Sequence, residues 1–460
     1  MTIFPKPFLH PISLNCGVEW FRFAVKRVLA ASLEVVMSFS NQLEGSDYTF
    51  ICGCKEDARS ACAEQPYNKY KGEPYCVFHY PGKEKASDFE KALQVKLDSK
   101  DFNFRGVWFP YETPFEGFLF TEEADFTGAT FSTIANFKKA KFSKNARFSN
   151  ATFTEGANYF RADFDALAGF IDAKFIAEAD FSYVKFSRGA DFDSAFGREA
   201  NFNYATFNGE AYFRYATFKN KVNLRSATFG DHVRFGQKEF GEHSSLDLQY
   251  ARIEKPDHVS FDSLTLHPHW FVNVDPRKFD FINIEWKRQT IEQEIDNLRK
   301  MMEPTKKKDK LSSYRLLART YRQLAVNAEE NNRYDEASDF RYRSMELWRI
   351  DKQHHSFNAM VGCLYWLASG YGERIGKALL VLSAIWVTFA IGYVLTGHIQ
   401  IHRWYDIFNA FTYSLGVITL QKPEPKSTGI LTSALITLEM ILGPLQAALL
   451  ALAIRRKFMR

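Results

Sequence analysis

Large aromatic residues recur along the chain at a spacing that neither a helix nor a regular strand produces. Phenylalanine stands at positions 126, 131, 137, 142, 148, 153, 160, 164, 170, 175, 181, 186, 192, 196, 202, 207, 213 and 218, and Leu224, Phe229, Phe235 and Phe240 continue the series. The spacings are mostly 5 and 6 in alternation, so the period is 11. Helices and strands have side-chain periods of 3.6 and 2.0. The pattern predicts a chain that turns a corner about every five residues and points one ring per segment toward an axis.

A small residue usually stands two places before each large ring, as Ala124 does before Phe126. Successive coils of such a chain lie about 4.8 Å apart, as neighbouring strands do. The small residues then leave space for rings that stack from coil to coil, and Tyr159 fits this register better than Phe160. We expect a less regular extension of the stack by Leu264, Leu266, Phe271, Val274, Phe279, Phe281 and Trp286.

Six triplets carry a resemblance to a known repeat. They are Ala124-Asp125-Phe126, Ala135-Asn136-Phe137, Ala162-Asp163-Phe164, Ala179-Asp180-Phe181, Ala190-Asp191-Phe192 and Ala200-Asn201-Phe202. They resemble pentapeptide repeats, whose form is A-[DN]-F/L-x-x. The resemblance implies a right-handed quadrilateral β-helix, a pentapeptide-repeat solenoid with four segments per coil and about five coils over 126–240.

The aspartates of these repeats hold a fixed position, which favours hydrogen bonding at the corners over a catalytic role. They are Asp125, Asp163, Asp180 and Asp191. Some pentapeptide-repeat proteins resemble duplex DNA and inhibit topoisomerases through an acidic surface. Residues 121–240 contain 15 Asp and Glu against 16 Lys and Arg. A surface so close to neutrality does not imitate the phosphate charge of DNA, so we place that function third and expect no nucleic-acid partner.

Four of the six cysteines lie near one histidine, ahead of the repeats. Cys54, Cys62, Cys76 and His79 would make a Cys3His set for structural Zn²⁺, with Cys52 as the spare thiol. The segment between them holds Gly53, Pro66, Gly72 and Pro74 and little apolar material, so a metal would supply order that no core provides. Free thiols or a disulfide are the alternatives. The run 75–85 also looks like a segment found ahead of some pentapeptide-repeat arrays, and Ala86–Leu97 is predicted to be a helix that caps the first coil.

After Trp286 the pattern becomes helical. Lys287–Met302 is amphipathic, and Leu311–Ala328 with Tyr334–Ile350 predicts a helical hairpin. We expect one apolar face from Leu316, Leu317, Tyr321 and Leu324 and another from Tyr334, Ala337, Phe340, Met345 and Leu347. The hairpin resembles part of a tetratricopeptide repeat, but one copy does not form a superhelix, so a connector or oligomerisation element is favoured over a peptide-binding site.

Two long apolar runs follow, Ala378–Leu395 without a charge and Leu431–Ile454 with Glu439 alone. Each is long enough to cross a hydrocarbon core about 30 Å thick. Arg374 and Lys377 precede the first run, and a basic cluster ends the second. The excess of basic residues at these ends predicts a multi-pass protein of the cell (inner) membrane with both the solenoid and the C-terminus in the cytoplasm. Cysteines stay reduced there, which favours metal over disulfide.

Between the runs, Tyr405–Leu420 is too apolar for an exposed loop and predicts a re-entrant helix. The order span, re-entrant helix, span looks like a two-helix ion-channel pore domain. The resemblance would place a filter near Gly416, after Thr412 and Ser414, although the Tyr-Gly of potassium filters is missing. Glu439 lies inside the second run, and a carboxylate there is a candidate pore-lining or interhelical residue. A simple hairpin anchor is the alternative.

Composition narrows the function classes only a little. Phe accounts for 45 of 460 residues, the net charge is +5, and 6 Cys are too few for a disulfide scaffold. Signatures of nucleophilic catalysis, phosphate loops or dinucleotide binding do not appear, so we expect no enzyme. The leading hypothesis is an oligomeric ion channel, a tetramer that passes a monovalent cation. A membrane-anchored scaffold, with protein ligands on the solenoid faces, is the second.

These patterns divide the chain into five parts: an amphipathic segment (1–50), a Cys/His-rich cap (51–98), the solenoid (99–286), a helical connector (287–356) and a two-span pore-like domain in contact with lipid (357–460). The stretch Trp20–Phe39 is interrupted by charges and is expected to be an amphipathic helix rather than a span. No secretory signal is expected at Met1–Pro11.

Overall fold

The computed structural model describes residues 51–458 apart from 64, 237–239, 242, 303–312, 352–356, 401–405, 422–423 and 425–428. Cys52–Arg460 form one compact unit. The amphipathic helix expected over Trp20–Phe39 lies outside the described residues, as does the first residue of the expected re-entrant helix, Tyr405.

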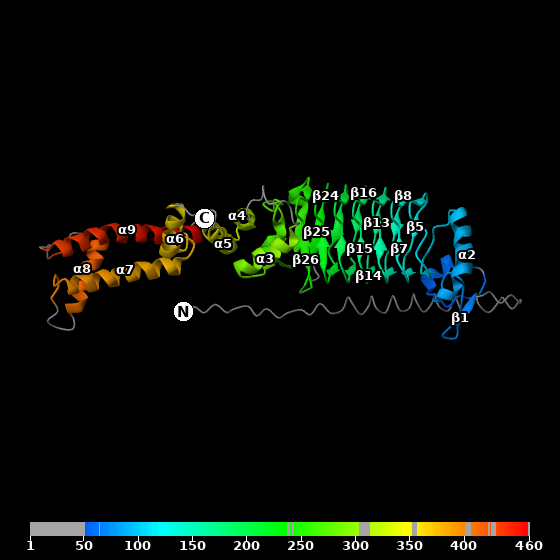
Figure 1. Cartoon of the computed structure of the whole chain (residues 1–460), viewed down its shortest axis with the longest axis horizontal. Coiled ribbons are helices and arrows are strands. Elements are labelled where there is room, and N and C mark those ends of the chain that lie inside the picture. Colours follow the sequence, from blue (N-terminus) through cyan, green and yellow to red (C-terminus); the bar gives the residue numbers. More distant parts are fainter. Residues whose placement is uncertain are drawn as a thin grey trace, which may run out of the picture. The chain divides into compact units, whose positions relative to one another are not determined.

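Short parallel strands build a β-solenoid of about eight turns, and they form four sheets of six to eight strands (Figure 1). One sheet contains β3 (Trp108–Phe109), β6 (Thr130–Phe131), β10 (Thr152–Phe153), β14 (Lys174–Phe175), β18 (Ala195–Phe196) and β22 (Thr217–Phe218). The second contains β7 (Ala135–Asn136), β11 (Ala157–Asn158), β15 (Ala179–Asp180), β19 (Ala200–Asn201), β23 (Lys221–Asn223) and β26 (Ser245–Asp247).

The other two sheets follow the same coil-to-coil order. One contains β4 (Leu119–Phe120), β8 (Lys141–Phe142), β12 (Asp163–Phe164), β16 (Lys185–Phe186), β20 (Thr206–Phe207), β24 (Thr228–Phe229) and β27 (Arg252–Ile253). The last contains β5 (Ala124–Asp125), β9 (Ala146–Arg147), β13 (Ala168–Gly169), β17 (Ala190–Asp191), β21 (Ala211–Phe213), β25 (Val233–Gly236), β28 (Val259–Asp262) and β30 (Asp280–Ile282). A two-stranded sheet of β29 (Thr265–Leu266) and β31 (Glu285–Trp286) comes after them in the chain.

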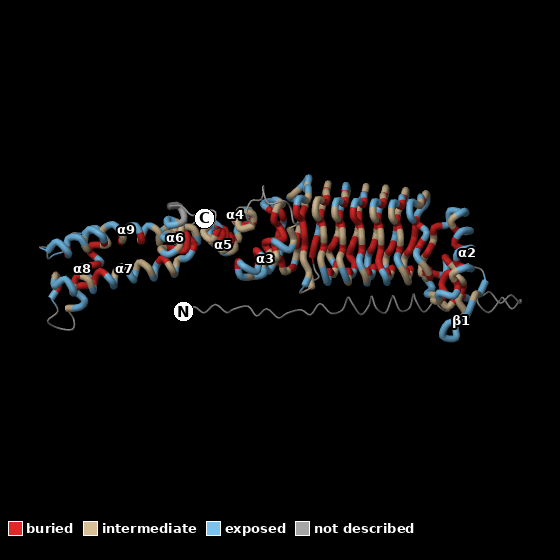
Figure 2. The backbone as a smooth tube through the Cα atoms, viewed as in Figure 1, coloured by how far each residue is buried: buried red, intermediate tan, exposed pale blue. Residues whose placement is uncertain are grey.

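Stacked aromatic rings fill the solenoid, and Figure 2 shows the buried residues lining its inside. Phe126 and Phe148 stack at 4.8 Å between centroids with 2° between the ring planes. Tyr159 is fully buried and stacks on Phe181 at 4.7 Å, whereas Phe160 is only partly buried. The predicted ring ladder and the predicted place of Tyr159 in it are therefore confirmed. Of the expected extension, Val274 and Trp286 are half-buried and the other five side chains are buried.

The repeat aspartates do form corner hydrogen bonds, with one exception. The Oδ1 atoms of Asp125, Asp180 and Asp191 each accept the backbone N–H two residues further on, at 2.9–3.1 Å. Asp163 lies in a different sheet, where its neighbours one coil away are lysines, and its Oδ1 has no hydrogen-bond partner among the described residues. The expectation was therefore wrong for Asp163, because its triplet occupies another segment of the coil.

A small cap covers the first coil of the solenoid. It consists of η1 (Glu56–Ala61), the antiparallel pair β1 (Asn68–Tyr70) and β2 (Glu73–Tyr75), η2 (Lys83–Lys85) and α2 (Ala86–Asp98). Phe89 of α2 is fully buried and packs edge-to-face on Phe109 of the first coil, with 5.5 Å between centroids. The predicted capping helix is confirmed, and it shields the aromatic rings at the first coil of the stack from water.

Helices continue the chain beyond the solenoid. The last coils contain two short 3-10 helices, η3 (Pro256–His258) and η4 (Pro268–Phe271). The first α-helices after them in the chain are α3 (Ile291–Met301), α4 (Ser313–Glu330) and α5 (Tyr334–Ile350). Asn327 of α4 donates from Nδ2 to the carbonyls of Pro276, Arg277 and Phe279 at 2.7–3.1 Å, which fixes the α4–α5 hairpin to the last coil. Most of the expected apolar faces are buried, but Met345 is 37% exposed because it lies on the outer side of α5.

The remaining helices are α6 (Phe357–Ser369), α7 (Ile375–Leu395), α8 (Asp406–Ile418) and α9 (Ile430–Phe458). The helices α7 and α9 are long and apolar enough to cross a membrane. Both pack against α8, and Figure 2 shows exposed residues along their outer faces. The sequence pattern did not reveal α6, because its 13 residues have apolar side chains on most faces and no clear period.

Candidate functional sites

The Cys/His cluster lies in the cap, where short elements bring distant residues together. Cys52 and Cys54 precede η1, Cys62 follows it directly, and Cys76 and His79 come from the turn after β2. The backbone N–H of Gly53 donates to the Pro74 carbonyl at 2.7 Å, which holds the first of these segments beside the third.

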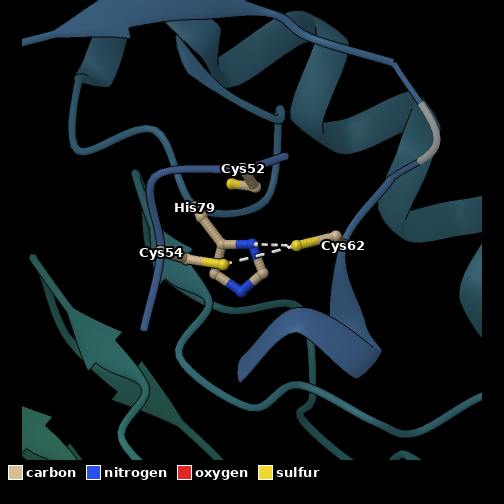
Figure 3. A group of neighbouring side chains, drawn as sticks. All are labelled: Cys52, Cys54, Cys62 and His79. Atoms are coloured by element: carbon tan, nitrogen blue, oxygen red, sulfur yellow. Dashed lines mark hydrogen bonds between the residues drawn. The ribbon is translucent and has the colours of Figure 1, made fainter. Parts of the chain in front are cut away.

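The ligand atoms of Cys52, Cys54, Cys62 and His79 all lie within 4.8 Å of one another (Figure 3). The sulfurs of Cys54 and Cys62 are 3.4 Å apart, and Cys62 Sγ lies 3.4 Å from His79 Nδ1. Cys76 Sγ lies 3.1 Å from the same nitrogen. All five residues proposed from the sequence therefore lie in one region, but the group whose ligand atoms are mutually close contains Cys52 as its third sulfur, where the sequence analysis expected Cys76.

The tautomer of His79 is set by its surroundings. Its Nε2 lies 2.9 Å from the backbone carbonyl oxygen of Arg105. A carbonyl only accepts, so Nε2 carries the proton, and in the neutral ring Nδ1 presents its lone pair to the sulfurs. In metal sites, a hydrogen bond of this kind from the non-ligating ring nitrogen to a carbonyl oxygen fixes the orientation of the histidine ring. A backbone N–H also donates to sulfur, from Cys76 to Cys52 Sγ at 3.3 Å.

The electrostatics of the cluster favour one thiolate before any metal is considered. A hydrogen bond with the Cys52 thiol lowers the pKa of Cys76 to about 3. Burial raises the pKa of Cys62 well above its ordinary range. The thiolate is the form of cysteine that binds a metal, so a cation bound here would have to displace the protons of the thiols that remain un-ionised.

Lys85 is a buried charge beside this cluster that the sequence did not indicate. Its side chain is fully buried, Nζ donates to the Phe78 carbonyl at 2.8 Å, and it lies 4.7 Å from the centroid of the Phe89 ring. Burial lowers the pKa of Lys85 to about 7, opposed by the nearby Cys76 and Cys52 thiols. Its position at the start of the predicted capping helix offered no signal, since lysine there is usually solvated.

The second site lies among α7, α8 and α9. Glu439 of α9 is fully buried; Tyr393 of α7 donates its hydroxyl to one carboxylate oxygen, and Ser414 of α8 donates to the other. Trp386 of α7 donates from Nε1 to the Phe411 carbonyl of α8 at 2.9 Å. Of the two roles expected for Glu439, the structure shows the interhelical one within a single chain.

The other pore candidates lie along α8. Thr412 is exposed and its hydroxyl donates to the carbonyls of Phe408 and Asn409 within the helix. Gly416 is buried inside α8, which continues to Ile418. The expectation that a filter begins at Gly416 was wrong, because α8 continues through Gly416 and ends at Ile418. An extended segment would begin only after Ile418.

A charged network joins the connector to both long helices, and no local pattern in the chain indicates it. Glu373, between α6 and α7, accepts from Arg341 of α5 at 2.8 Å and from Arg456 of α9 at 3.0 Å. Gln446 of α9 donates to the Ala368 and Ala378 carbonyls at 2.7 and 2.8 Å. The start of α7 and the end of α9 are therefore tied together, beside α5.

Comparisons with known proteins inform the solenoid alone. Residues 115–158 and 193–237 match the family model described as pentapeptide repeats. No curated protein and no solved structure matches the chain. The unmatched stretch between the two segments contains the displaced Phe160, and its rings nevertheless continue the same columns. The parallel solenoid of this chain is thus built of pentapeptide repeats.

Proposed function

We propose that this chain is a subunit of an oligomeric ion channel of the cell membrane, with α7, α8 and α9 as its pore domain and the solenoid in the cytoplasm. The observation that carries the proposal is the anchoring of α8. With 13 residues it is about 20 Å long, too short to cross a core about 30 Å thick. It nevertheless packs between two span-length helices and is hydrogen-bonded to both.

The surfaces of these helices support a membrane setting. Large apolar side chains of α9 face outward, among them Ile430, Leu431 and Ile441, with exposed fractions of 91, 75 and 60%. Leu380 of α7 and Leu364 of α6 are likewise exposed, by 68 and 58%. A soluble chain rarely leaves so many large apolar residues in water, whereas lipid or further copies of the chain would cover them.

The charges support the proposed orientation. The bond between Arg456 and Glu373 brings the end of α9 to the start of α7, where Arg374 also lies. Both basic ends of the pair are thus on one side, beside the connector, as expected when that side faces the cytoplasm. The same network gives a physical path from the solenoid, through α5, to both spans.

Reconstitution into planar bilayers tests the proposal. We expect unitary currents from wild type and a high oligomeric state in detergent that is lost when the chain ends at Gly376. Glu439→Ala removes the carboxylate that accepts from the Tyr393 and Ser414 hydroxyls, so α8 loses its hydrogen bond to α9 and conduction should be abolished or strongly altered.

Thr437→Ala is the matched control, since Thr437 is exposed on the same helix and its hydroxyl donates to the Ser433 carbonyl within that helix. This variant should conduct as wild type does. Silent bilayers together with a monomeric or dimeric detergent species would contradict the channel and favour an anchored scaffold.

We also propose that the Cys/His cluster holds one structural Zn²⁺. The donor set fits: three sulfurs and an imidazole nitrogen with its lone pair directed at them. A metal there would order residues 51–85, where few apolar side chains are buried. Elemental analysis should find one zinc fewer per chain in Cys62→Ser than in wild type, with protease cutting first in this segment.

Cys363→Ser is the control for the zinc experiment, because Cys363 is an exposed thiol far along the chain, on α6. Cys52→Ser and Cys76→Ser separate the two possible fourth ligands: the variant that loses zinc names the ligand. Equal zinc content and equal protease resistance in wild type and Cys62→Ser would contradict the site.

A scaffold remains the second candidate because of an aromatic edge on the solenoid. Tyr183 and Tyr204 are exposed by 46 and 48% and stack at 4.9 Å on successive coils, and Arg161 lies 5.6 Å from the Tyr183 ring. Both tyrosines have φ near +57°, which is unfavourable for a bulky residue. A protein ligand would use such an edge, and Tyr183→Ala with Tyr204→Ala should then abolish its binding.

A further inference from the structure

A second group of histidine and carboxylate side chains, of the types that ligate metals, lies on the solenoid away from the cap. Asp231 and His232 precede β25, and His258 precedes β28. The two strands pair with Val233 opposite Val259, so the two histidines are neighbours from one coil to the next although 26 residues separate them. Sequence spacing conceals this pair, and only the coil register reveals it.

The three side chains converge on one oxygen. His232 Nδ1 lies 2.8 Å and His258 Nδ1 3.0 Å from Asp231 Oδ1, and the imidazole rings stack with 3.9 Å between centroids. The backbone N–H of His232 donates to the same oxygen at 2.9 Å. Three nitrogens therefore crowd an oxygen that has two lone pairs, and two stacked rings would repel each other if both were protonated.

The second carboxylate oxygen of Asp231 is occupied by a different partner. Lys255 Nζ lies 3.0 Å from Oδ2, which fixes the carboxylate and leaves Oδ1 directed at the two rings. Glu210 adds a further carboxylate 3.9 Å from His232 Nδ1.

We propose that Asp231, His232 and His258 bind a divalent late first-row transition metal ion, with Zn²⁺ as the reference cation. Their ligand atoms all lie within 4.8 Å of one another. Two imidazole nitrogens and one carboxylate oxygen suit such ions, and a cation between them replaces the crowded contacts by coordination. The side chains are 30–34% exposed, so water completes the coordination sphere.

The site has a structural use in the solenoid. Most coils advance by about 22 residues, as from Ala211 to Val233, but the next one, from Val233 to Val259, takes 26. The metal would join the two ends of this longer coil, at the residues just before its paired strands. A metal ion that binds the folded chain and not the unfolded chain would raise the melting temperature, and the rise would increase with the metal concentration.

Zinc titration of the full chain in detergent, by calorimetry and by equilibrium dialysis, tests the proposal. Wild type should bind one Zn²⁺ more than His258→Asn at zinc concentrations that saturate the wild-type site, because the variant lacks one of three protein ligands. Lys255→Met should keep the metal. Cys62→Ser should leave zinc binding at the Asp231, His232 and His258 site unchanged. The experiment therefore tests this site separately from the cap site.

His243→Asn is the matched control, since His243 is an exposed histidine of the same region outside the group. The variants should retain the circular-dichroism spectrum of the solenoid, because the changed side chains lie at its surface. Equal zinc stoichiometry in wild type and His258→Asn would overturn the proposal, as would a loss in His243→Asn equal to that in His258→Asn.

Discussion

The solenoid and the helices α7–α9 bury their apolar residues in opposite ways. Rings such as Phe181 and Phe142 are fully buried by the coils above and below them, within one chain. In α7 and α9, Leu395 and Ile430 are exposed by 82 and 91%. The repeats thus complete their own core, whereas the C-terminal helices leave large apolar side chains exposed, which in our proposal are covered by lipid or by another copy of the chain.

The polar groups of the two regions differ in the same sense. At the corners of the solenoid, one local hydrogen bond recurs from coil to coil, as at Asp125 and Asp180, so no single corner decides the fold. Among the helices, Glu439, Glu373 and Gln446 each make a tie that no other described residue repeats. Replacing a repeated group should therefore have local effects, and replacing a single tie should affect assembly and function.

Phe181→Ala should be the largest stability change in this comparison. It removes a fully buried ring that stacks on Tyr159 and Phe202 at 4.7 and 5.0 Å, and stacked coils relax poorly around the cavity. We expect a loss of about 3–5 kcal/mol in the free energy of unfolding, measured by denaturant titration of the solenoid signal. Asp180→Asn should be almost silent, because the oxygen that accepts from Ser182 is retained. A Phe181→Ala variant that unfolds with wild-type stability would refute the inward ring ladder.

Glu294→Gln tests the junction between the two regions through pH. Glu294 of α3 is buried and accepts from the Tyr321 hydroxyl, and burial raises its pKa from 4.5 to about 7. The folded state therefore holds this proton more tightly than the unfolded state. The contribution of this protonated carboxyl to the free energy of unfolding is fully present below about pH 4.5. It is lost as the pH rises toward 7, by about 3 kcal/mol in all. The difference in melting temperature between wild type and Glu294→Gln should follow that curve, and a flat difference from about pH 4.5 to 8 would show that the carboxyl is not shifted.

The sequence was most informative where structure repeats. A period of 11 with a large ring in each segment leaves few alternatives, and it placed even Tyr159 correctly. The cysteine cluster was found because cysteine is rare in this chain and four of the six lie close together in sequence. The capping helix and the hairpin were found through their amphipathic pattern, although the pattern put Met345 on the wrong face.

The remaining features depend on contacts that no local pattern encodes. The triad of Arg341, Glu373 and Arg456 joins residues from three elements, and surface charges of these types are usually solvated. His232 and His258 meet only because the coil register aligns them. The end of α8 was misjudged, because a glycine inside an apolar run is compatible with both a helix and a turn.

Tyr393→Phe should be moderately destabilising. Tyr393 is buried in α7 and donates its hydroxyl to Glu439 at 2.5 Å, so its removal leaves a buried carboxylate with one donor fewer. We expect a loss of about 1–3 kcal/mol, seen as a lower melting temperature of the protein in detergent and a weaker oligomer. Unchanged stability and assembly would indicate that another donor reaches Glu439 in the assembled protein.

A Tyr→Phe substitution inside the solenoid, at Tyr159, should stabilise the protein, and its effect should be the smallest of those predicted. Tyr159 is fully buried between Phe137 and Phe181, and its hydroxyl has no hydrogen-bond partner among the described residues. Tyr159→Phe keeps the stacked ring and removes a desolvated polar group, so the free energy of unfolding should rise by about 1 kcal/mol. Phe137→Tyr, one coil away in the same column, is the reverse control and should lower it. A less stable Tyr159→Phe would mean that this hydroxyl is bonded, and that the solenoid, like the helices, contains a polar tie of its own.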